Sequence, residues 1–424
     1  AQSITKIPDF EQQNMANTAW AFASRLERNQ PLLAAISSAS RATIPQFACQ
    51  SLSNPAWAFA TLGEDDAPLL AALASAAIAR IQQMSPQDLS ITAWSFALLG
   101  FWHGTLLDAI ASASIPRLLD FTSQQLSNLS WSCASLVYLH GPLLAAIAAS
   151  SIAKIPHASQ QDLANTSWAF ANLEVLHEPL LQSIAASARR RISEFEMQGV
   201  ANPAWAFATI SLVDDPLLDA IAASALRKIT ERETLPQNLS NIAWSFAVLG
   251  LRNLTLLKSI ASAALAKSTA FTAQDLANTA WAFATFSLLS PPLLQAISSQ
   301  ALARISQFDM QHLSNPAWSM AQLQCRDPPL LTAIAAASMP RLAEARNFRT
   351  QNVSNTAWAF AVLSIRAEPL LDALAAAARS SISEFTPQDL GTTVWSFSTI
   401  QWAPAPLLQA ISAAALRRWM ELGP

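Results

Sequence analysis

The sequence has little charge and few of the residues that build metal sites. Only 12% of its 424 residues are charged, and the net charge is −3, whereas nucleic-acid-binding proteins are usually basic. The three cysteines, Cys49, Cys133 and Cys325, are scattered and form no CxxC pair, which excludes a disulfide framework and a cysteine-based zinc site. We expect no metal and a reducing compartment.

Residues that carry catalysis are also scarce. There are only eight glycines, and none belongs to a glycine-rich phosphate-binding loop. No Ser/His/Asp or Cys/His arrangement stands out, and no pair of carboxylates recurs at one position. We therefore expect a protein that is not an enzyme and that needs no cofactor. The histidines are widely separated and lack metal-ligand spacing: His103, His140, His157, His177 and His312.

Long apolar runs are absent as well. Stretches such as 142–152 are shorter than the roughly 20 residues that cross a bilayer, so we expect no membrane insertion. No signal or transit peptide is visible in this stretch. The chain is thus either cytosolic or already processed.

What the chain does have is a tryptophan at nearly fixed intervals. The successive spacings are 37, 37, 37, 37, 37, 39, 37, 37, 40 and 37 residues. A period between about 20 and 50 residues is typical of stacked repeat proteins. The recurring tryptophans are Trp20, Trp57, Trp94, Trp131, Trp168, Trp205, Trp244, Trp281, Trp318, Trp358 and Trp395.

Other positions repeat with the tryptophan. A glutamine lies seven residues before it in all eleven units, an asparagine three before it in nine, and a Leu-Leu pair twelve and thirteen after it in every unit. Residues 274–286 read as a first helix, and residues 216–229, which begin at a proline suited to a first turn, as a second. The sequence predicts an all-α, right-handed α-solenoid of about eleven helix-hairpin repeats of 37 residues.

We expect one solenoid over residues 1–424, with the two longer spacings absorbed by charged loops near 230–235 and 344–350. Residues 1–12 resemble the end of a further repeat, so we expect either a longer chain or partners that cover the ends. The predicted repeats are 13–49, 50–86, 87–123, 124–160, 161–197, 198–236, 237–273, 274–310, 311–350, 351–387 and 388–424.

The first helix has two distinct sides. At 100° per residue, the Gln, Asn and Trp positions and the residue four after the Trp fall within about 60° of one another, while recurrent Leu and Phe fall opposite and form the core. The residue four after the Trp varies between repeats, so it is a candidate for reading individual RNA bases. Its candidate base-reading members are Ser24, Thr61, Ser135, Asn172, Thr209, Thr285, Gln322 and Thr399.

Purely structural roles are the alternative explanation for the recurrent Gln, Asn and Trp and for the variable position. The Trp is either a stacking platform for single-stranded nucleic acid or a packing residue between helices. The Gln and Asn rows either meet a ligand or hydrogen-bond loop backbone between repeats. Variation at one position is also what an exposed surface shows.

A cation lies 23 residues after the tryptophan in nine of the eleven units. Stacking would align these residues into a basic ladder that follows an RNA phosphate backbone even though the total charge is negative. Alternatively, they complement the dipole at the C-terminal end of the second helix. The basic ladder consists of Arg80, Arg117, Lys154, Arg191, Lys228, Lys267, Arg304, Arg341 and Arg418.

The first-helix signature, as in residues 274–284 with the sequence QDLANTAWAFA, resembles octotricopeptide repeats and the related heptatricopeptide repeats. The resemblance covers essentially the whole chain. It implies a helical-hairpin solenoid that binds RNA in mitochondria or plastids and acts in RNA processing, stability, translation or ribosome assembly.

Taken together, these patterns predict an organellar RNA-binding repeat protein. Its expected partners are single-stranded RNA and other proteins of an organellar ribonucleoprotein or large complex. The alternative is a non-enzymatic scaffold subunit of a large organellar complex, which the low charge favours.

Overall fold

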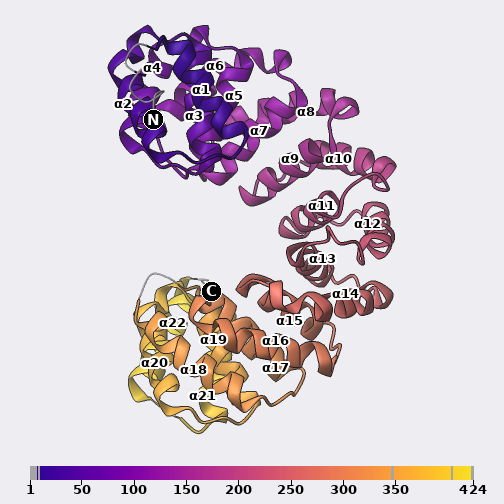
Figure 1. Cartoon of the computed structure of the whole chain (residues 1–424). Coiled ribbons are helices and arrows are strands. Elements are labelled where there is room, and N and C mark those ends of the chain that lie inside the picture. The colour runs from indigo at the N-terminus through magenta and orange to yellow at the C-terminus, as the bar shows by residue number, and fades with distance from the viewer. Residues whose placement is uncertain (1–6, 8–9, 345–347, 403, 422–424) are drawn as a thin grey trace. The chain divides into compact units, whose positions relative to one another are not determined.

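The structure is a computed structural model that describes residue 7 and residues 10–344, 348–402 and 404–421, with only the backbone described for 418–421. In this part of the chain every regular element is an α-helix or a short 3-10 helix, and none is a strand. The prediction of an all-α fold is confirmed (Figure 1).

The chain divides into two compact units, residues 1–195 with 212–220 and residues 196–211 with 221–424. We call them the N-terminal and C-terminal units. Each is built from helix hairpins. In the N-terminal unit the first helices are α1 (Gln12–Ser24), α3 (Cys49–Leu62), α5 (Pro86–Leu98), α7 (Ser123–Ser135) and α9 (Gln160–Asn172), and the second helices are α2 (Gln30–Thr43), α4 (Ala67–Ala79), α6 (Gly104–Ser114), α8 (Gly141–Lys154) and α10 (Glu178–Arg191).

The C-terminal unit continues the same pattern, and the boundary between the units falls within α12 (Asp215–Lys228). Its first helices are α11 (Met197–Thr209), α13 (Pro236–Val248), α15 (Ala273–Thr285), α17 (Met310–Gln322), α19 (Thr350–Val362) and α21 (Pro387–Thr399), and its second helices after α12 are α14 (Leu254–Lys267), α16 (Pro291–Arg304), α18 (Pro328–Ala343), α20 (Glu368–Ser380) and α22 (Ala405–Glu421).

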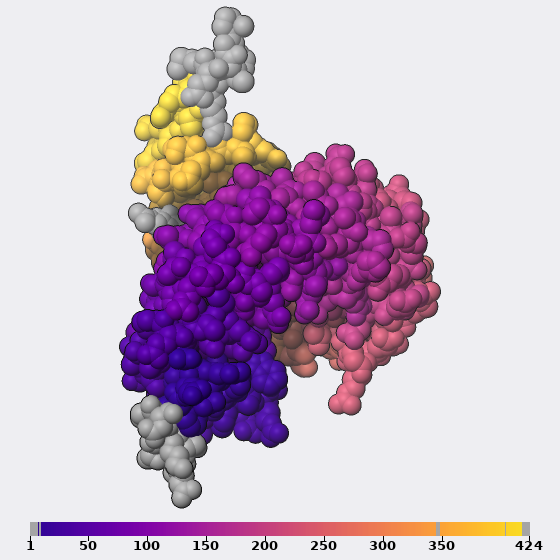
Figure 2. Space-filling model, turned by 90° about the horizontal axis from the view of Figure 1, so that it is seen from above, coloured from indigo at the N-terminus to yellow at the C-terminus, as the bar shows by residue number. Residues whose placement is uncertain are grey.

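Within each unit, first helices pack on the first helices of neighbouring repeats, as α5 does on α3 and α7 and α17 does on α15 and α19. The second helices form a row of their own, less tightly packed. Each unit is therefore a helical-repeat solenoid, as predicted. The space-filling view in Figure 2 shows the continuous side-chain surface of the N-terminal unit, from indigo to magenta. The right-handed twist and one solenoid across residues 1–424 remain predictions.

Five of the first helices begin at a Ser or Thr that forms a capping box. At α5 the Ser85 hydroxyl accepts from the Asp88 amide at 3.2 Å, and the Asp88 carboxylate accepts from the Ser85 amide at 3.0 Å. This pairing satisfies amides that have no partner inside the helix. The same box opens α7, α9, α15 and α21. Helix bounds agree with the sequence to one residue: the predicted 274–286 is observed at 273–285.

Each hairpin turns at a residue six positions after the tryptophan, whose backbone is left-handed. Glycine takes this position at Gly63 with φ 65°, but Val137 has φ 52° and Glu174 has φ 55°. In this conformation the chain leaves the helix while the last carbonyls still accept amides, as Phe96 does from Phe101 at 2.9 Å.

The predicted core positions are buried. Phe96 two after its tryptophan, Leu89 five before it, and the Leu106-Leu107 pair are each at most 4% exposed. Short 3-10 helices link one repeat to the next, among them η2 (Ile44–Gln46), η3 (Ile81–Gln83), η4 (Ile115–Asp120), η5 (Ile155–His157), η6 (Ser268–Ala270), η7 (Ile305–Gln307) and η8 (Ile382–Glu384). The residue after a linker is often a fully buried Phe, such as Phe47 or Phe121.

Candidate nucleic-acid interface

The recurrent glutamines lie on the surface of the first helices. All eleven, including Gln87 and Gln274, are exposed, and none has a side-chain hydrogen bond to another described residue. The interpretation that they satisfy loop backbone between repeats therefore finds no bonds to support it. A polar group that is exposed and unpaired in every repeat has no role in holding the fold together.

The asparagines three before the tryptophan lie beside these glutamines. Most are half-buried, whereas Asn17 is exposed and Asn278 is buried at 7% exposure. We call the surface formed by the Gln, Asn and Trp positions of the first helices the amide face. Each amide both donates and accepts hydrogen bonds, so the amide face offers neutral groups of both kinds in every repeat.

The tryptophans form a column along this face. In six neighbouring pairs the ring centroids are 6.2–6.4 Å apart with planes tilted by 27–36°. Trp94 and Trp131 are one such pair, and both are half-buried. Each indole thus stabilises the stack through its neighbour and still presents part of its ring, while Trp20 and Trp395 are about half exposed, at 50% and 48%.

Two grooves open on the amide face, one in each unit. In the N-terminal unit a groove of about 430 Å³ is lined by Trp57, Trp94, Gln87, Gln124 and Asn128 among others. In the C-terminal unit a groove of about 550 Å³ is lined by the corresponding Gln351, Asn355 and Gln388, with Arg349 beside them. Both grooves are large enough to admit a nucleobase, and their lining of Gln, Asn, Ser and Thr is largely polar.

The predicted base-reading residues lie along the same helices. Ser24, Asn172, Gln322 and Thr399 are exposed, and Thr61, Ser135, Thr209 and Thr285 are half-buried. Several of their polar groups are already engaged. The Thr209 and Thr285 hydroxyls donate to the tryptophan carbonyl one turn earlier, each at 2.9 Å, and so do those of Ser24 and Thr399, each at 2.8 Å.

Asn172 instead reaches the preceding repeat, where its amide donates to the Ala134 carbonyl at 3.2 Å. The hydroxyl oxygens keep their acceptor lone pairs. The assignment of these eight residues to base reading remains a prediction.

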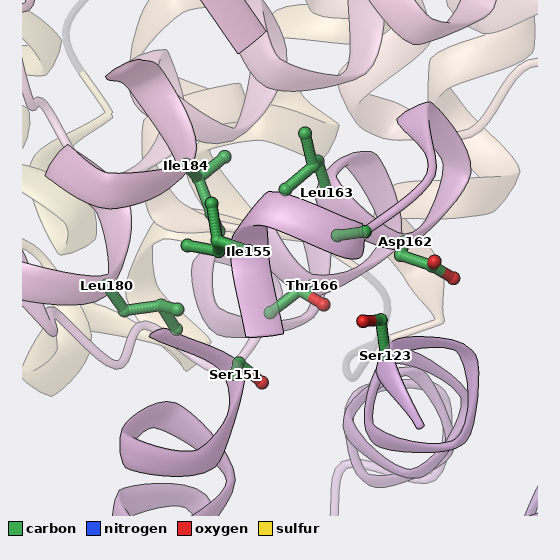
Figure 3. A pocket seen from close by; sticks show the side chains of 9 residues that line it. Ser123, Ser151, Ile155, Asp162, Leu163, Thr166, Leu180 and Ile184 are labelled. Carbon is green, nitrogen blue, oxygen red and sulfur yellow. The ribbon is translucent and has the colours of Figure 1, made fainter. Parts of the chain in front are cut away.

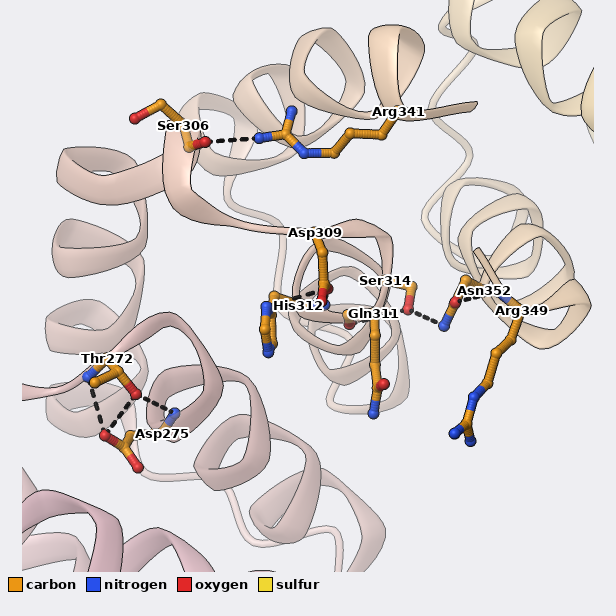
Figure 4. A network of polar contacts seen from close by, with 10 residues as sticks. All are labelled: Thr272, Asp275, Ser306, Asp309, Gln311, His312, Ser314, Arg341, Arg349 and Asn352. Carbon is orange, nitrogen blue, oxygen red and sulfur yellow. Dashed lines mark hydrogen bonds and ion pairs between the residues drawn. The ribbon is translucent and has the colours of Figure 1, made fainter. Parts of the chain in front are cut away.

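The basic ladder lies at the linkers between repeats, and its described side chains are half-buried. Arg117 donates to the Met84 carbonyl of the preceding linker at 3.0 Å, and Arg191 donates to the Ala158 carbonyl at 2.7 Å. Figure 4 shows the equivalent bond from Arg341 to the Ser306 carbonyl, 2.8 Å long. The other members with such bonds are Arg80 to the Phe47 and Pro45 carbonyls, Lys154 to Leu119, Lys267 to Thr234, and Arg304 to Phe271 and Thr269.

These bonds give the basic ladder a structural role that differs from the two predicted ones, which were complementing helix dipoles and binding phosphates. Each of these seven cations ties the end of a second helix to the linker before its own repeat. Arg191 and Lys228 also lie near Glu194 and Glu231, at 3.7 and 4.0 Å. A guanidinium has five N–H donors, so positive charge and spare donors remain at the linkers. Phosphate binding by these residues remains a prediction, and the side chain of Arg418 lies outside the described residues.

A second bond between repeats was not visible in the sequence pattern. The Ser53 hydroxyl, four before Trp57, donates to the buried carboxylate of Asp88 in the next repeat at 2.9 Å. Ser127 bonds Asp162 in the same way at 3.2 Å, and Ser354 bonds Asp389 at 2.9 Å.

Burial alone raises the pKa of Asp389, but the hydrogen bonds from Thr386, Ser354 and Thr350 together lower it below its usual value.

Three histidines cap second helices. The Nδ1 atoms of His103, His140 and His177 accept the amides of Leu106, Leu143 and Leu180 at 3.1–3.2 Å. Their recurrence at the position before the second helix, where five of the other eight repeats carry Asn or Asp, was the available signal. Among the described residues no group of three or more His, Cys, Asp or Glu could hold a metal ion.

A much smaller cavity lies among α7, α8, α9 and α10. Figure 3 shows Ser151, Asp162, Thr166 and Ile184 around a space of only about 10 Å³, which has room for no more than a water molecule. Burial raises the pKa of the core thiol Cys133 to about 12, so this cysteine stays protonated at neutral pH. No helix in the described part of the chain is long and apolar enough to span a membrane.

Comparison with known proteins bears on this surface. A family model described as RNA-editing substrate-binding complex 6 protein (RESC6) matches residues 1–227 and again residues 217–420. The chain belongs to this family. Membership in RESC6 agrees with the coarser expectation of an RNA-associated helical-repeat family, without pointing to octotricopeptide or heptatricopeptide repeats in particular.

The other comparisons add little. No curated protein matches the sequence. A homology model of the full-length AP-3 complex in an intermediate open conformation matches with 9% identity and a TM-score of 0.35, over 98% of this chain and 90% of that one. At that score the similarity carries no inference about function.

Proposed function

We propose that this chain is a non-enzymatic, single-stranded-RNA-binding subunit of an RNA-editing substrate-binding complex in an organelle, either a mitochondrion or a plastid. The observation that carries the proposal is the amide face. In each unit the exposed glutamines, which have no side-chain hydrogen bond to another described residue, lie next to half-exposed tryptophans on the first helices. The family name and the resemblance of the repeat to octotricopeptide and heptatricopeptide repeats support the same function.

Amide chemistry suits unpaired RNA. Base edges and the 2′-hydroxyl each present donors and acceptors, and single-stranded RNA leaves these groups free. Gln and Asn side chains can match either kind of group, whereas Lys and Arg can only donate. Tryptophan edges beside them add apolar contact with base faces and sugars. A neutral reading surface also explains how an RNA-binding chain can have a net charge of −3.

Selectivity and phosphate contact come from the flanking residues. The residue four after the tryptophan changes from repeat to repeat and lies on the same helix, so it is the position able to favour one base over another. The basic ladder at the linkers supplies positive charge within reach of a phosphate backbone that follows the first helices. If each repeat contacts one base, the array accommodates at most about eleven nucleotides.

The decisive experiment is a matched set of charge-adding variants. Gln87→Glu, Gln124→Glu and Gln161→Glu together place three carboxylates in the amide-face groove. The control is Gln182→Glu, Gln295→Glu and Gln409→Glu, which adds the same charge at exposed sites of second helices. Short-range repulsion should weaken RNA binding by about tenfold or more in the first variant, and the control should bind much as the parent does.

The measurement is an equilibrium titration of labelled RNA recovered by crosslinking the native protein and sequencing the bound fragments. Equal losses in both variants would mean that only overall charge matters, and the amide face would then not be the binding surface. A protein from which no discrete RNA can be recovered would instead be a scaffold.

A further inference from the structure

A row of large apolar side chains is exposed in the N-terminal unit, on the edge opposite the linkers. This edge consists of the loops inside successive hairpins, and we call residues 62–68, 99–105, 136–142, 173–179 and 212–216 the hairpin edge. Trp102, Leu139, Leu176 and Val213 occupy the same position in four consecutive repeats, eight residues after the tryptophan. They are 55%, 66%, 55% and 52% exposed, and Val137 beside Leu139 is 74% exposed.

Single exposed apolar residues are common, but a continuous row marks an interaction surface. The row is also held in place. The Trp102 ring lies 6.1 Å from that of Tyr138 in the next hairpin, and the Tyr138 hydroxyl donates to Asp108 at 2.6 Å. His140 stacks on Tyr138 at 5.7 Å and also caps α8. Preformed positions lower the entropy lost when a partner binds.

Val137 extends the exposed apolar surface beside Leu139. Its φ of 52° is a left-handed conformation that suits glycine and that a β-branched residue avoids. A valine there costs roughly 1–2 kcal/mol and, at 74% exposure, contributes almost nothing to the core. The same position holds Gly63 and Gly100 in the two preceding repeats and Glu174, with φ 55°, in the following one. Every hairpin turns through this conformation, so the strain belongs to the turn, and what Val137 adds to the row is an exposed apolar side chain.

The negative charge of the hairpin edge indicates which kind of partner can bind there. Its five loops contain seven carboxylates and no Lys or Arg, whereas the hairpin before them, residues 25–31, carries Arg25 and Arg28, and Arg28 lies 3.8 Å from Glu64. Asp65, Glu174, Glu178 and Asp215 are exposed and make no hydrogen bond or ion pair with another described residue. Such a surface repels RNA phosphates and anionic lipid headgroups, and it attracts a basic protein segment that carries apolar side chains.

We infer that the hairpin edge of the N-terminal unit docks a basic amphipathic segment of another protein subunit. The apolar side chains of that segment cover the row from Trp102 to Val213, and its Lys or Arg residues meet Glu174, Glu178 and Asp215. The basic ladder lies at the linkers, so RNA and this protein partner use opposite edges of the same repeats. The inference does not depend on RNA binding by the amide face.

The first test is site-specific photocrosslinking in the native complex. A photoreactive amino acid replaces Leu139, and a control replaces the exposed Gln182 on α10. We expect one dominant crosslinked peptide from Leu139 that is rich in apolar residues and Lys or Arg, and no such product from Gln182. Crosslinks to RNA, to a second copy of this chain or to an acidic peptide, or equal products from both sites, would overturn the inference.

The second test measures affinity for the peptide so identified. Leu139→Asp with Leu176→Asp should weaken it about tenfold or more, and Glu174→Lys with Asp215→Lys should weaken it several-fold, with a smaller difference at high salt. Thermal unfolding and RNA affinity, measured on the same proteins, should stay close to the parent. Unchanged or tighter peptide binding after the charge reversal would show that the partner is not basic.

Discussion

The Ser240 hydroxyl donates to the Asp275 carboxylate of the following repeat across 2.7 Å. The same carboxylate accepts the Thr272 amide at 3.0 Å and the Thr272 hydroxyl at 2.7 Å, and Asp275 is only 3% exposed. One buried side chain thus both starts α15 and holds it against α13.

Asp275→Ala should therefore destabilise the C-terminal unit more than the loss of an ordinary helix cap. Removing a cap costs about 1 kcal/mol, and losing the bond from the buried Ser240 hydroxyl, which keeps only the Gln237 carbonyl as an acceptor, adds about 0.5–1.5 kcal/mol. The urea midpoint should fall accordingly. Asn253→Ala, which removes the side-chain cap of α14 at the Leu256 amide, is the matched control, and an equal effect there would argue against the inter-repeat bond.

Asp389 predicts how stability depends on pH. Its pKa is lowered in the folded chain, because the hydrogen bonds from Thr386, Ser354 and Thr350 outweigh burial. Its stabilising contribution is therefore complete above the unfolded pKa, near 3.9, and is lost as the pH falls through the lower folded value. Thermal unfolding from pH 6 to pH 2 should show a smaller acid loss in Asp389→Asn than in the parent. Parallel curves would contradict this assignment.

The left-handed hairpin residues predict stabilising substitutions. Ser287 has φ 53° and lies in a hairpin of the C-terminal unit, away from the hairpin edge described above. Ser287→Gly should raise the free energy of unfolding by up to about 1 kcal/mol, because glycine accepts this conformation without strain. The same change at Ser75, in the middle of α4, should instead lower it by a similar amount. Chemical denaturation of both variants distinguishes the two effects.

A substitution at Lys154 distinguishes the two roles of the basic ladder, bonding to the linker and binding phosphate. The Lys154 ammonium donates to the Leu119 carbonyl at 2.8 Å. Lys154→Gln keeps a donor for that carbonyl but removes the charge, so stability should change little. If Lys154 contacts a phosphate, the plot of log affinity for RNA against log salt concentration should be less steep for Lys154→Gln than for the parent, with a slope smaller in magnitude by about 1. A parent-like slope would assign Lys154 to the linker alone.

Periodic residues made most of the fold predictable. The spacing of Trp, Gln and Leu-Leu reports which residues share a helix face, and helix faces decide the core, so the hairpins and buried positions such as Leu89 follow from the sequence. The amide face also follows, because Gln87 and Trp94 lie on one side of any helix that contains both.

Contacts between repeats could not be predicted in this way. The bonds from Ser53 to Asp88 and from Arg117 to the Met84 carbonyl depend on how one hairpin is placed on the next. A projection of a single helix contains no information about that placement. The basic ladder was found as a row, but its carbonyl partners became visible only in three dimensions.

The bonds of the basic ladder have a consequence for synthesis on the ribosome. Arg117 binds the carbonyl of a linker that left the ribosome 33 residues earlier, and Arg191 does the same for Ala158. Each linker therefore acquires its fixed conformation only after the whole following hairpin has been made. The nascent chain should therefore fold from its N-terminus, one repeat behind the repeat that is being synthesised. The most recently synthesised linker should always be the part that proteases or chaperones can reach.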